Sequence, residues 1–158
     1  MACYHPLAAF QSKVNGGKLL FKPPFDLSSY NSLMIPCGQC IGCRLEYSRT
    51  WAIRCMHEAS LYDSNLFVTL TYDNEHLPSN GSLCYRDFQL FMKRLRRYLG
   101  PVRFYMCGEY GGKTNRPHYH ALLFNFSFDD KCYYKGSGFS KLYTSAKLDR
   151  VWSNGLCC

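Results

Sequence analysis

The stretch from residue 102 to residue 126 constrains the fold most, because two strand-like runs are joined there by a very short connection. The residues between the runs include Gly111-Gly112, Asn115 and Pro117, which are typical of turns. A parallel pairing would need a crossover of about a dozen residues or more. Residues 102–107 and 118–126 are therefore expected to form an antiparallel hairpin.

Hydrophobic periodicity predicts the remaining elements. Residues 85–99 have one apolar stripe at helical spacing, formed by Phe88, Phe91, Met92, Leu95 and Leu99. Residues 44–62 show a similar, weaker helical pattern, and residues 66–72 have the β-branched and aromatic composition of a strand. Ser145 is expected to cap a short helix that ends near Trp152.

The two ends of the chain lack such patterns. Residues 1–36 contain Gly16-Gly17 and Pro23-Pro24 and are expected to be irregular. After Trp152 the chain is expected to end without a closing strand. We find no internal repeat and no second domain.

Composition limits the class of protein. The chain has 158 residues, of which 47% are hydrophobic and 16% aromatic, so it can bury a core and is not a disordered tail. No run approaches the roughly 18 apolar residues that span a bilayer, and no signal peptide opens the sequence. The net charge is +8, which favours a polyanionic partner. We expect a soluble, intracellular protein without a membrane partner.

The segment 86–103 carries much of the positive charge, with six Lys or Arg residues against one Asp, a net charge of +5. A solvated helix face is the usual explanation of such a run. Contact with nucleic-acid phosphates is the alternative that we favour. The candidate DNA-binding residues are Arg86, Lys93, Arg94, Arg96, Arg97 and Arg103.

Two histidines in the second strand of the hairpin could bind a metal ion. Residues two apart in a strand point to the same face, so His118 and His120 project together. Glu109 lies near the end of the first strand, opposite the start of the second, and could supply a carboxylate ligand. Two histidines and one carboxylate leave positions open for catalysis. The alternative is a pair of ordinary surface histidines.

The ten cysteines favour reduced thiols, some of them metal ligands, with disulfides as the alternative. Cys37, Cys40 and Cys43 follow one another at the spacing with which a loop surrounds Zn²⁺. A structural zinc site needs a fourth ligand, for which Cys3 and His5 are the candidates. An iron–sulfur cluster and a loop of metal-free cysteines are the other interpretations.

Three blocks in this order resemble the HUH endonucleases that initiate rolling-circle replication: Phe67-Val-Thr-Leu-Thr-Tyr72, Gly108-Glu-Tyr-Gly111 and Arg116-Pro-His-Tyr-His-Ala-Leu-Leu-Phe124. The resemblance is closer to the replication initiators of microviruses of the gokushovirus branch. The cysteine cluster, the start Cys3-Tyr-His-Pro6 and the block from Leu142 to Trp152 carry it further. It covers nearly the whole chain.

The resemblance implies an α+β fold of ferredoxin or RRM type, with helices on one face of an antiparallel sheet. It divides the chain into an irregular segment with the thiol cluster (residues 1–43) and a nuclease domain (residues 44–158) that is incomplete at its C-terminus. It also implies Mg²⁺ or Mn²⁺ at the histidines and a tyrosine that attacks single-stranded or origin DNA. The products are a 5′-phosphotyrosine and a free 3′-OH. Host replication machinery and the host cytoplasm are the implied partner and location.

The family's nucleophilic tyrosine has no clear counterpart. Tyr143, with Lys147 four residues on, is a weak candidate, and the stronger expectation places the nucleophile beyond residue 158 in a chain that is truncated or frameshifted. Three functions therefore remain open. They are an active nickase, a remnant that binds metal and DNA without cutting, and a small zinc protein that binds DNA.

Overall fold

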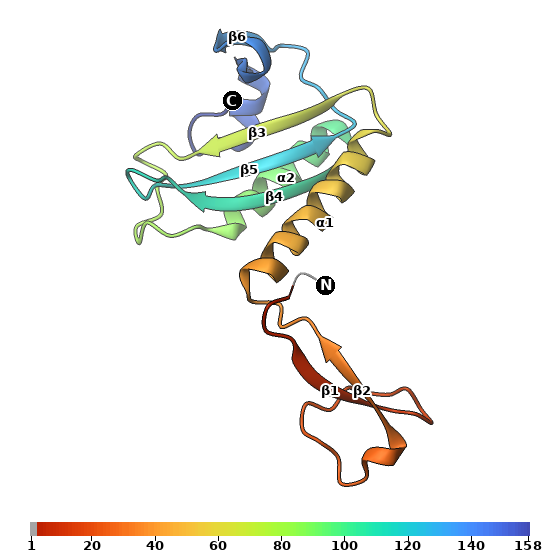
Figure 1. The fold of residues 1–158 in the computed structure, drawn as a ribbon. Helices are drawn as coiled ribbons and strands as arrows, with labels where there is room; N and C mark the ends of the chain where they lie inside the picture. Colours follow the sequence, from red (N-terminus) through yellow and green to blue (C-terminus); the bar gives the residue numbers. More distant parts are fainter. Residues whose placement is uncertain (1–2) are drawn as a thin grey trace. The chain divides into compact units, whose positions relative to one another are not determined.

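The computed structural model describes residues 3–158 (Figure 1). The chain divides into two compact units, residues 1–54 and residues 55–158. One helix, α1 (Ile41–Ala59), begins in the first unit and ends in the second. Each unit is described by itself below.

The second unit is built on a three-stranded antiparallel sheet. Its strands are β3 (Asn65–Thr71), β4 (Arg103–Tyr110) and β5 (Pro117–Phe124), in the spatial order β3-β5-β4. The short turn after β4 brings β5 back antiparallel to it, so the predicted hairpin is confirmed. β3 pairs antiparallel with the other side of β5.

Helices cover one face of this sheet. The helix α2 (Tyr85–Leu99) buries Phe88, Phe91, Met92 and Leu95, the stripe that the sequence predicts apart from the more exposed Leu99. Figure 1 shows α2 behind the three strands. The stripe packs with the inward-facing residues of the sheet, which include Val68, Leu70, Tyr119, Ala121 and Leu123. The predicted α+β class, with helices on one face of an antiparallel sheet, is confirmed.

Hydrogen bonds stabilise both ends of the helix α3 (Ala146–Trp152). The Ser145 hydroxyl accepts a hydrogen bond from the backbone N–H of Leu148, which confirms the predicted N-cap. At the other end Trp152 is fully buried and donates from its indole N–H to the Thr71 carbonyl, 2.8 Å away. The Arg94 guanidinium donates to the carbonyls of Val151 and Trp152.

The last three residues lie along the outer edge of β3. Thr69 exchanges two backbone hydrogen bonds with Cys158, and the N–H of Thr71 donates to the Leu156 carbonyl. No further strand follows α3 within residues 3–158; these bonds form an isolated β-bridge between Leu70 and Cys157. Gly155 makes the approach possible, because it has a φ of +153° and a Cβ there would collide with the Thr71 carbonyl oxygen.

A small second sheet pairs β6 (Cys132–Lys135) with β7 (Leu142–Thr144), and a 3₁₀ turn, η2 (Gly138–Ser140), lies between them.

The first unit contains a second hairpin that the sequence patterns do not indicate. The strands β1 (Leu7–Ser12) and β2 (Tyr30–Ile35) pair antiparallel within the segment expected to be irregular, and a 3₁₀ turn, η1 (Leu27–Ser29), precedes β2. Only Ala9 is buried among the residues of these two strands. With neither face buried, the strands show no alternation of apolar and polar residues.

Candidate metal centre

The sheet has one open face, and Glu109, His118 and His120 come together on it. Alternate residues of β5 are buried against the helices, so the two histidines point the other way. The register pairs Glu109 directly with His118 across β4 and β5. The observed strand pairing therefore places these three residues on one face, as the sequence predicts.

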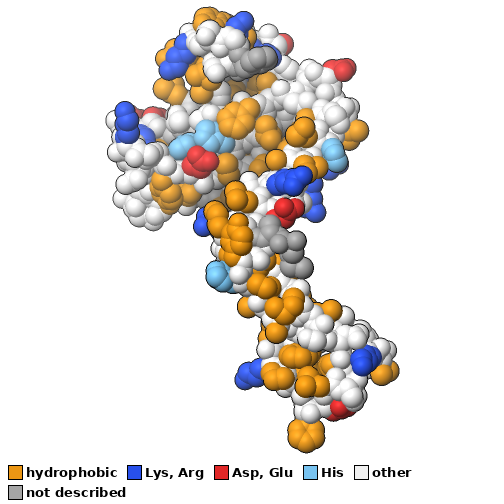
Figure 2. All heavy atoms as spheres, viewed as in Figure 1, with side chains coloured by type: hydrophobic (Ala, Val, Ile, Leu, Met, Phe, Trp, Pro, Cys, Tyr) orange, Lys and Arg blue, Asp and Glu red, His pale blue; other side chains and the backbone are white. Residues whose placement is uncertain are grey.

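The ligand atoms of the three residues lie within 4.8 Å of one another. The Glu109 carboxylate Oε2 is 3.9 Å from Nε2 of His118 and 3.7 Å from Nε2 of His120. The imidazole rings are nearly perpendicular, with centroids 4.9 Å apart. Figure 2 shows histidine and acidic side chains lying together over the sheet. This group can hold a metal ion.

The second nitrogen of each ring has a partner that orients it. His118 Nδ1 lies 3.2 Å from the Arg116 carbonyl oxygen, which can only accept, so Nδ1 donates to it and Nε2 is the nitrogen that faces Glu109. His120 Nδ1 lies 3.1 Å from the Thr69 hydroxyl on β3, which is able to accept in the same way. Such partners fix a metal-binding histidine in its ligating form.

Burial lowers the pKa of His120, and the neighbouring His118 lowers it further, while Glu109 acts in the opposite direction. The ring is therefore neutral at neutral pH, as a ligand must be. Cys107 faces His120 across the sheet, and its thiol donates to Glu109 Oε1. Burial and the Glu109 charge raise the pKa of this thiol, which keeps it protonated.

An aromatic ring borders the centre and also lines a neighbouring hollow. Phe67 of β3 is 61% exposed, yet its ring stacks on His120 with centroids 5.2 Å apart. A hollow of about 310 Å³ extends from Phe67 and Thr69 to Lys131, Lys141 and Tyr143. Sequence reasoning missed Phe67, Thr69 and Cys107 as neighbours of the histidines.

Tyr143 lies on the strand β7 and is exposed. Its ring contacts Tyr133 edge to face. Lys147 belongs to α3 and is paired with Asp129, so the two residues lie on different elements. Tyr143 does share the hollow with Phe67 and Thr69, which both contact His120.

The six candidate DNA-binding residues divide into two groups. Arg94 and Arg96 bind within the protein, since Arg94 donates to the Val151 carbonyl at the end of α3 and Arg96 donates to the Val102 carbonyl. Arg103 pairs with Glu58 at 2.9 Å. Of the cations of α2, Arg94 is half-buried, whereas Arg86, Lys93, Arg96 and Arg97 are exposed, and of these four Arg96 is held by a hydrogen bond to Val102. Because α2 packs on the covered face of the sheet, its exposed cations do not lie beside the histidines.

The second group of possible ligands lies in the first unit. The thiols of Cys3, Cys37, Cys40 and Cys43 lie within 4.8 Å of one another and can hold a metal ion, whereas His5 is not part of the group. All ten cysteines of the chain are free. Backbone N–H groups of Cys43 and Tyr4 lower the pKa of Cys40 to about 6, while burial raises that of Cys43 to about 12.

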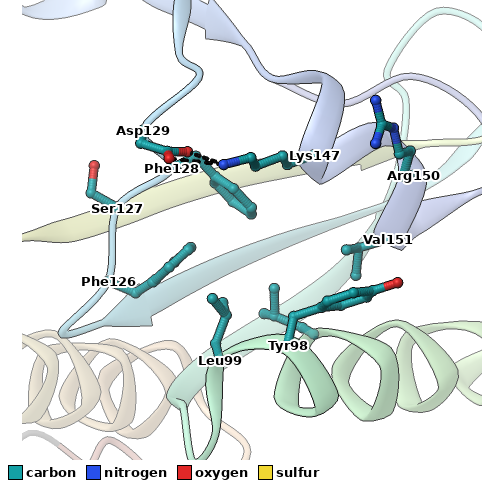
Figure 3. A pocket seen from close by; sticks show the side chains of 10 residues that line it. Tyr98, Leu99, Phe126, Ser127, Phe128, Asp129, Lys147, Arg150 and Val151 are labelled. Carbon is teal, nitrogen blue, oxygen red and sulfur yellow. Dashed lines mark hydrogen bonds and ion pairs between the residues drawn. The ribbon is translucent and has the colours of Figure 1, made fainter.

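A hollow of about 520 Å³ lies on the helical side of the sheet, where Tyr98 and Leu99 of α2 face Arg150 and Val151 of α3 (Figure 3). It is lined mainly by apolar side chains, and Lys147 is paired with Asp129 at its margin. It therefore lies on the opposite side of the sheet from the histidines and takes no part in the metal centre.

Comparison with known proteins gives one family match. Residues 65–157, which contain the sheet, α2, α3 and the histidines, match the family of the replication-associated protein ORF2. No solved structure matches the chain significantly. Within residues 3–158, no helix is both long enough and apolar enough to cross a membrane.

Relatives match almost the whole chain. The Replication-associated protein VP4 of Bdellovibrio phage phiMH2K is 39% identical over 165 residues, covering 98% of this chain and 51% of the relative. The Replication-associated protein ORF2 of Spiroplasma virus 4 is 34% identical, covering 98% and 54%. The Replication-associated protein ORF4 of Chlamydia phage 1 is 34% identical, covering 83% and 36%. The chain thus spans about half the length, or less, of these curated relatives.

Proposed function

Because this chain belongs to the family of the replication-associated protein ORF2, we propose that it is the metal-binding, DNA-engaging part of a rolling-circle replication initiator. The proposed reaction is the nicking of single-stranded DNA through a tyrosine. The tyrosine hydroxyl loses its proton as its oxygen bonds to phosphorus, the bond from phosphorus to the 3′-oxygen breaks, and the released 3′-oxygen takes up a proton. The free 3′-OH then primes synthesis.

One observation carries this proposal, the grouping of Glu109, His118 and His120 on the open face of the sheet. Side chains on the other face are packed against helices, whereas this face leaves room for a nucleic acid strand. Two imidazoles and one carboxylate suit a divalent cation and leave coordination positions for a substrate. Held there, Mg²⁺ or Mn²⁺ would supply stabilisation of the negative charge that develops on the attacked phosphate.

The surroundings of the centre suit single-stranded DNA. Phe67 offers an exposed ring on which a base can stack, next to the ligand His120. Lys131 and Lys141 line the adjoining hollow and offer charge to phosphates. We therefore assign the DNA path to this hollow and treat Arg86, Lys93 and Arg97 of α2 as a second, outer contact with phosphates.

Two positions remain for the nucleophile. Tyr143 is the candidate within residues 3–158, because it opens on the hollow that contains Phe67 and Thr69. Its position on a strand argues against it, since the resemblance implies a tyrosine on a helix. A tyrosine outside this sequence remains the stronger candidate, which fits relatives about twice as long as this chain.

The test is cleavage of single-stranded origin DNA with Mn²⁺ present. An active chain gives strand breaks and a covalent adduct, both lost in His120→Ala and both retained in the control His57→Ala. Loss of the adduct in Tyr143→Phe assigns the nucleophile to Tyr143. If the intact chain binds DNA in a salt-dependent way but gives no break and no adduct, nicking by this chain is excluded and the non-cutting interpretation holds.

The partners follow from the same proposal. The relatives are proteins of phages and a virus of bacteria, so we place the action in the host cytoplasm, on origin DNA and with host replication machinery.

The third interpretation, a small zinc protein with purely structural histidines, makes a different prediction. In that case His120→Ala would unfold the second unit, which circular dichroism would detect.

A further inference from the structure

The first unit lacks a hydrophobic core. Among the described residues up to position 54, Ala9 is the only buried hydrophobic side chain. The core cluster of the protein consists entirely of residues from Val68 to Cys157. Large apolar side chains such as Val14, Phe21 and Phe25 are exposed instead. A unit of about 50 residues without a core needs another source of stability, such as disulfides or a metal ion.

Disulfides do not supply it, because all of its cysteines are free. Four of them form a cluster whose sulfur atoms come from both ends of the unit. Cys3 precedes the hairpin of β1 and β2, Cys37 and Cys40 follow it, and Cys43 lies in the first turn of α1. A bond to all four sulfurs would therefore tie the N-terminus, the hairpin and the helix together.

The spacing of the sulfurs fits a tetrahedral ion. Four sulfurs at the usual zinc distance of about 2.3 Å from a central ion lie about 3.8 Å from one another. The sulfurs of Cys3 and Cys40 are 3.9 Å apart, and all four lie within 4.8 Å. Gly38 has a φ of +75°, a conformation that favours glycine and turns the chain between Cys37 and Cys40.

Backbone N–H groups donate to three of the four sulfurs. Cys3 accepts from the N–H of Cys37 at 3.3 Å, Cys37 from Cys40 at 3.4 Å, and Cys40 from Tyr4 at 3.4 Å. Such bonds stabilise thiolates, and they are the outer contacts that orient metal ligands.

The N-terminus of α1 also favours negative charge on the sulfurs. Cys40 is the residue just before the helix, and its carbonyl accepts the first helical hydrogen bond, from Arg44. The positive end of the helix dipole therefore lies beside the sulfurs, where negative charge is favourable. Zn²⁺ with four thiolates carries a net charge of −2, which these N–H groups and the helix end offset.

We propose that Cys3, Cys37, Cys40 and Cys43 bind one structural Zn²⁺ and that this ion holds the first unit folded. Four thiolates close the coordination shell, so the ion has no open position for substrate. The site is separate in role from the Glu109, His118 and His120 centre, and it stands whether or not the chain cuts DNA.

The first experiment measures metal content and ligand type in the full chain carrying His118→Ala and His120→Ala, so that the other centre does not contribute. We expect one zinc per chain, with four sulfur neighbours at about 2.3 Å by X-ray absorption. Loss of zinc is expected in Cys3→Ser and Cys43→Ser but not in Cys132→Ser, an exposed cysteine outside the cluster. No zinc, iron in its place, or a nitrogen neighbour from His5 at about 2.0–2.1 Å would overturn the assignment.

The second experiment tests the folding role without any substitution. Zinc is removed from the full chain with a chelator and its loss is verified by elemental analysis. Limited proteolysis is then expected to cut residues 3–54 at least about tenfold faster, while the sheet, α2 and α3 stay protected. An unchanged cutting rate in residues 3–54 of the zinc-free chain would refute the folding role.

Discussion

The Thr69 hydroxyl on β3 lies 3.1 Å from Nδ1 of His120 on β5, so the two residues are joined across the sheet from positions 51 apart in the chain. When this hydroxyl accepts a hydrogen bond from the Nδ1–H group, Nε2 of His120 faces Glu109. Thr69→Val removes the acceptor and keeps the shape of the side chain. We expect the Mn²⁺ affinity to fall about 10- to 100-fold, measured by titration calorimetry. Thr69→Ser restores the hydroxyl and should restore the affinity; equal binding by wild type and Thr69→Val would refute this role.

Phe67→Ala should weaken binding of single-stranded DNA with little change in stability, because the ring is 61% exposed. Loss of one stacked base is worth about 1–3 kcal/mol, or roughly 5- to 150-fold in the dissociation constant. Fluorescence anisotropy at a fixed salt concentration measures it. Phe67→Trp keeps a stacking surface and serves as the positive control, while Phe25→Ala, an exposed ring of the first unit, is the negative one. An unchanged affinity in Phe67→Ala would place the DNA path elsewhere.

Arg94→Met should destabilise the protein rather than weaken DNA binding. The guanidinium donates to two carbonyls and to the Ser153 hydroxyl at the end of α3. Hydrogen bonds from a charged group contribute about 1.5–3 kcal/mol, so the free energy of unfolding in urea should fall by that order. Lys93→Met, on the exposed side of the same helix, is the matched control and should change it by less than about 0.5 kcal/mol. The reverse order of the two effects would contradict the structural role of Arg94.

Asp130 makes the second unit sensitive to acid. Hydrogen bonds from the Ser145 hydroxyl and from the backbone N–H of Lys147 hold the pKa of this carboxyl below its usual 3.8. A lowered folded-state pKa gives stability that is complete above the unfolded pKa and is lost as the pH falls through the folded value. Asp130→Asn should therefore lower the melting temperature at pH 7, and the difference from wild type should shrink below about pH 4. Asp63→Asn, at an exposed carboxyl, is the control; a difference that stays constant with pH would be inconsistent with this linkage.

The sequence predicts the second unit well where burial of one face makes apolar residues recur at the spacing of a helix or a strand. The bounds of α2 agree with the apolar stripe, because that stripe packs against the core. His118 and His120 share a face because strand geometry requires it. The alternation of residues along β3 also predicts that Phe67 and Thr69 lie on the open face, since they alternate with the buried Val68 and Leu70. Only the order β3-β5-β4 determines that they lie beside the histidines.

The first unit was less predictable for a physical reason. Its hairpin buries almost nothing, so no apolar alternation distinguishes β1 and β2 from a loop. Cys3 and His5 stand two residues apart and were equivalent candidates, and the hairpin that brings Cys3 to Cys40 decided between them. Residues 156–158 were missed because three residues are too few to show a strand pattern.

The pairing of those last residues with β3 determines how the sheet can associate with other chains. A strand at a sheet edge is a template on which a foreign strand can assemble, and it promotes aggregation or strand exchange. Residues 156–158 occupy that template along Thr69 and Thr71. Within residues 3–158, β4 pairs only with β5. The strand that carries Glu109 therefore keeps one edge to which a further strand can hydrogen-bond.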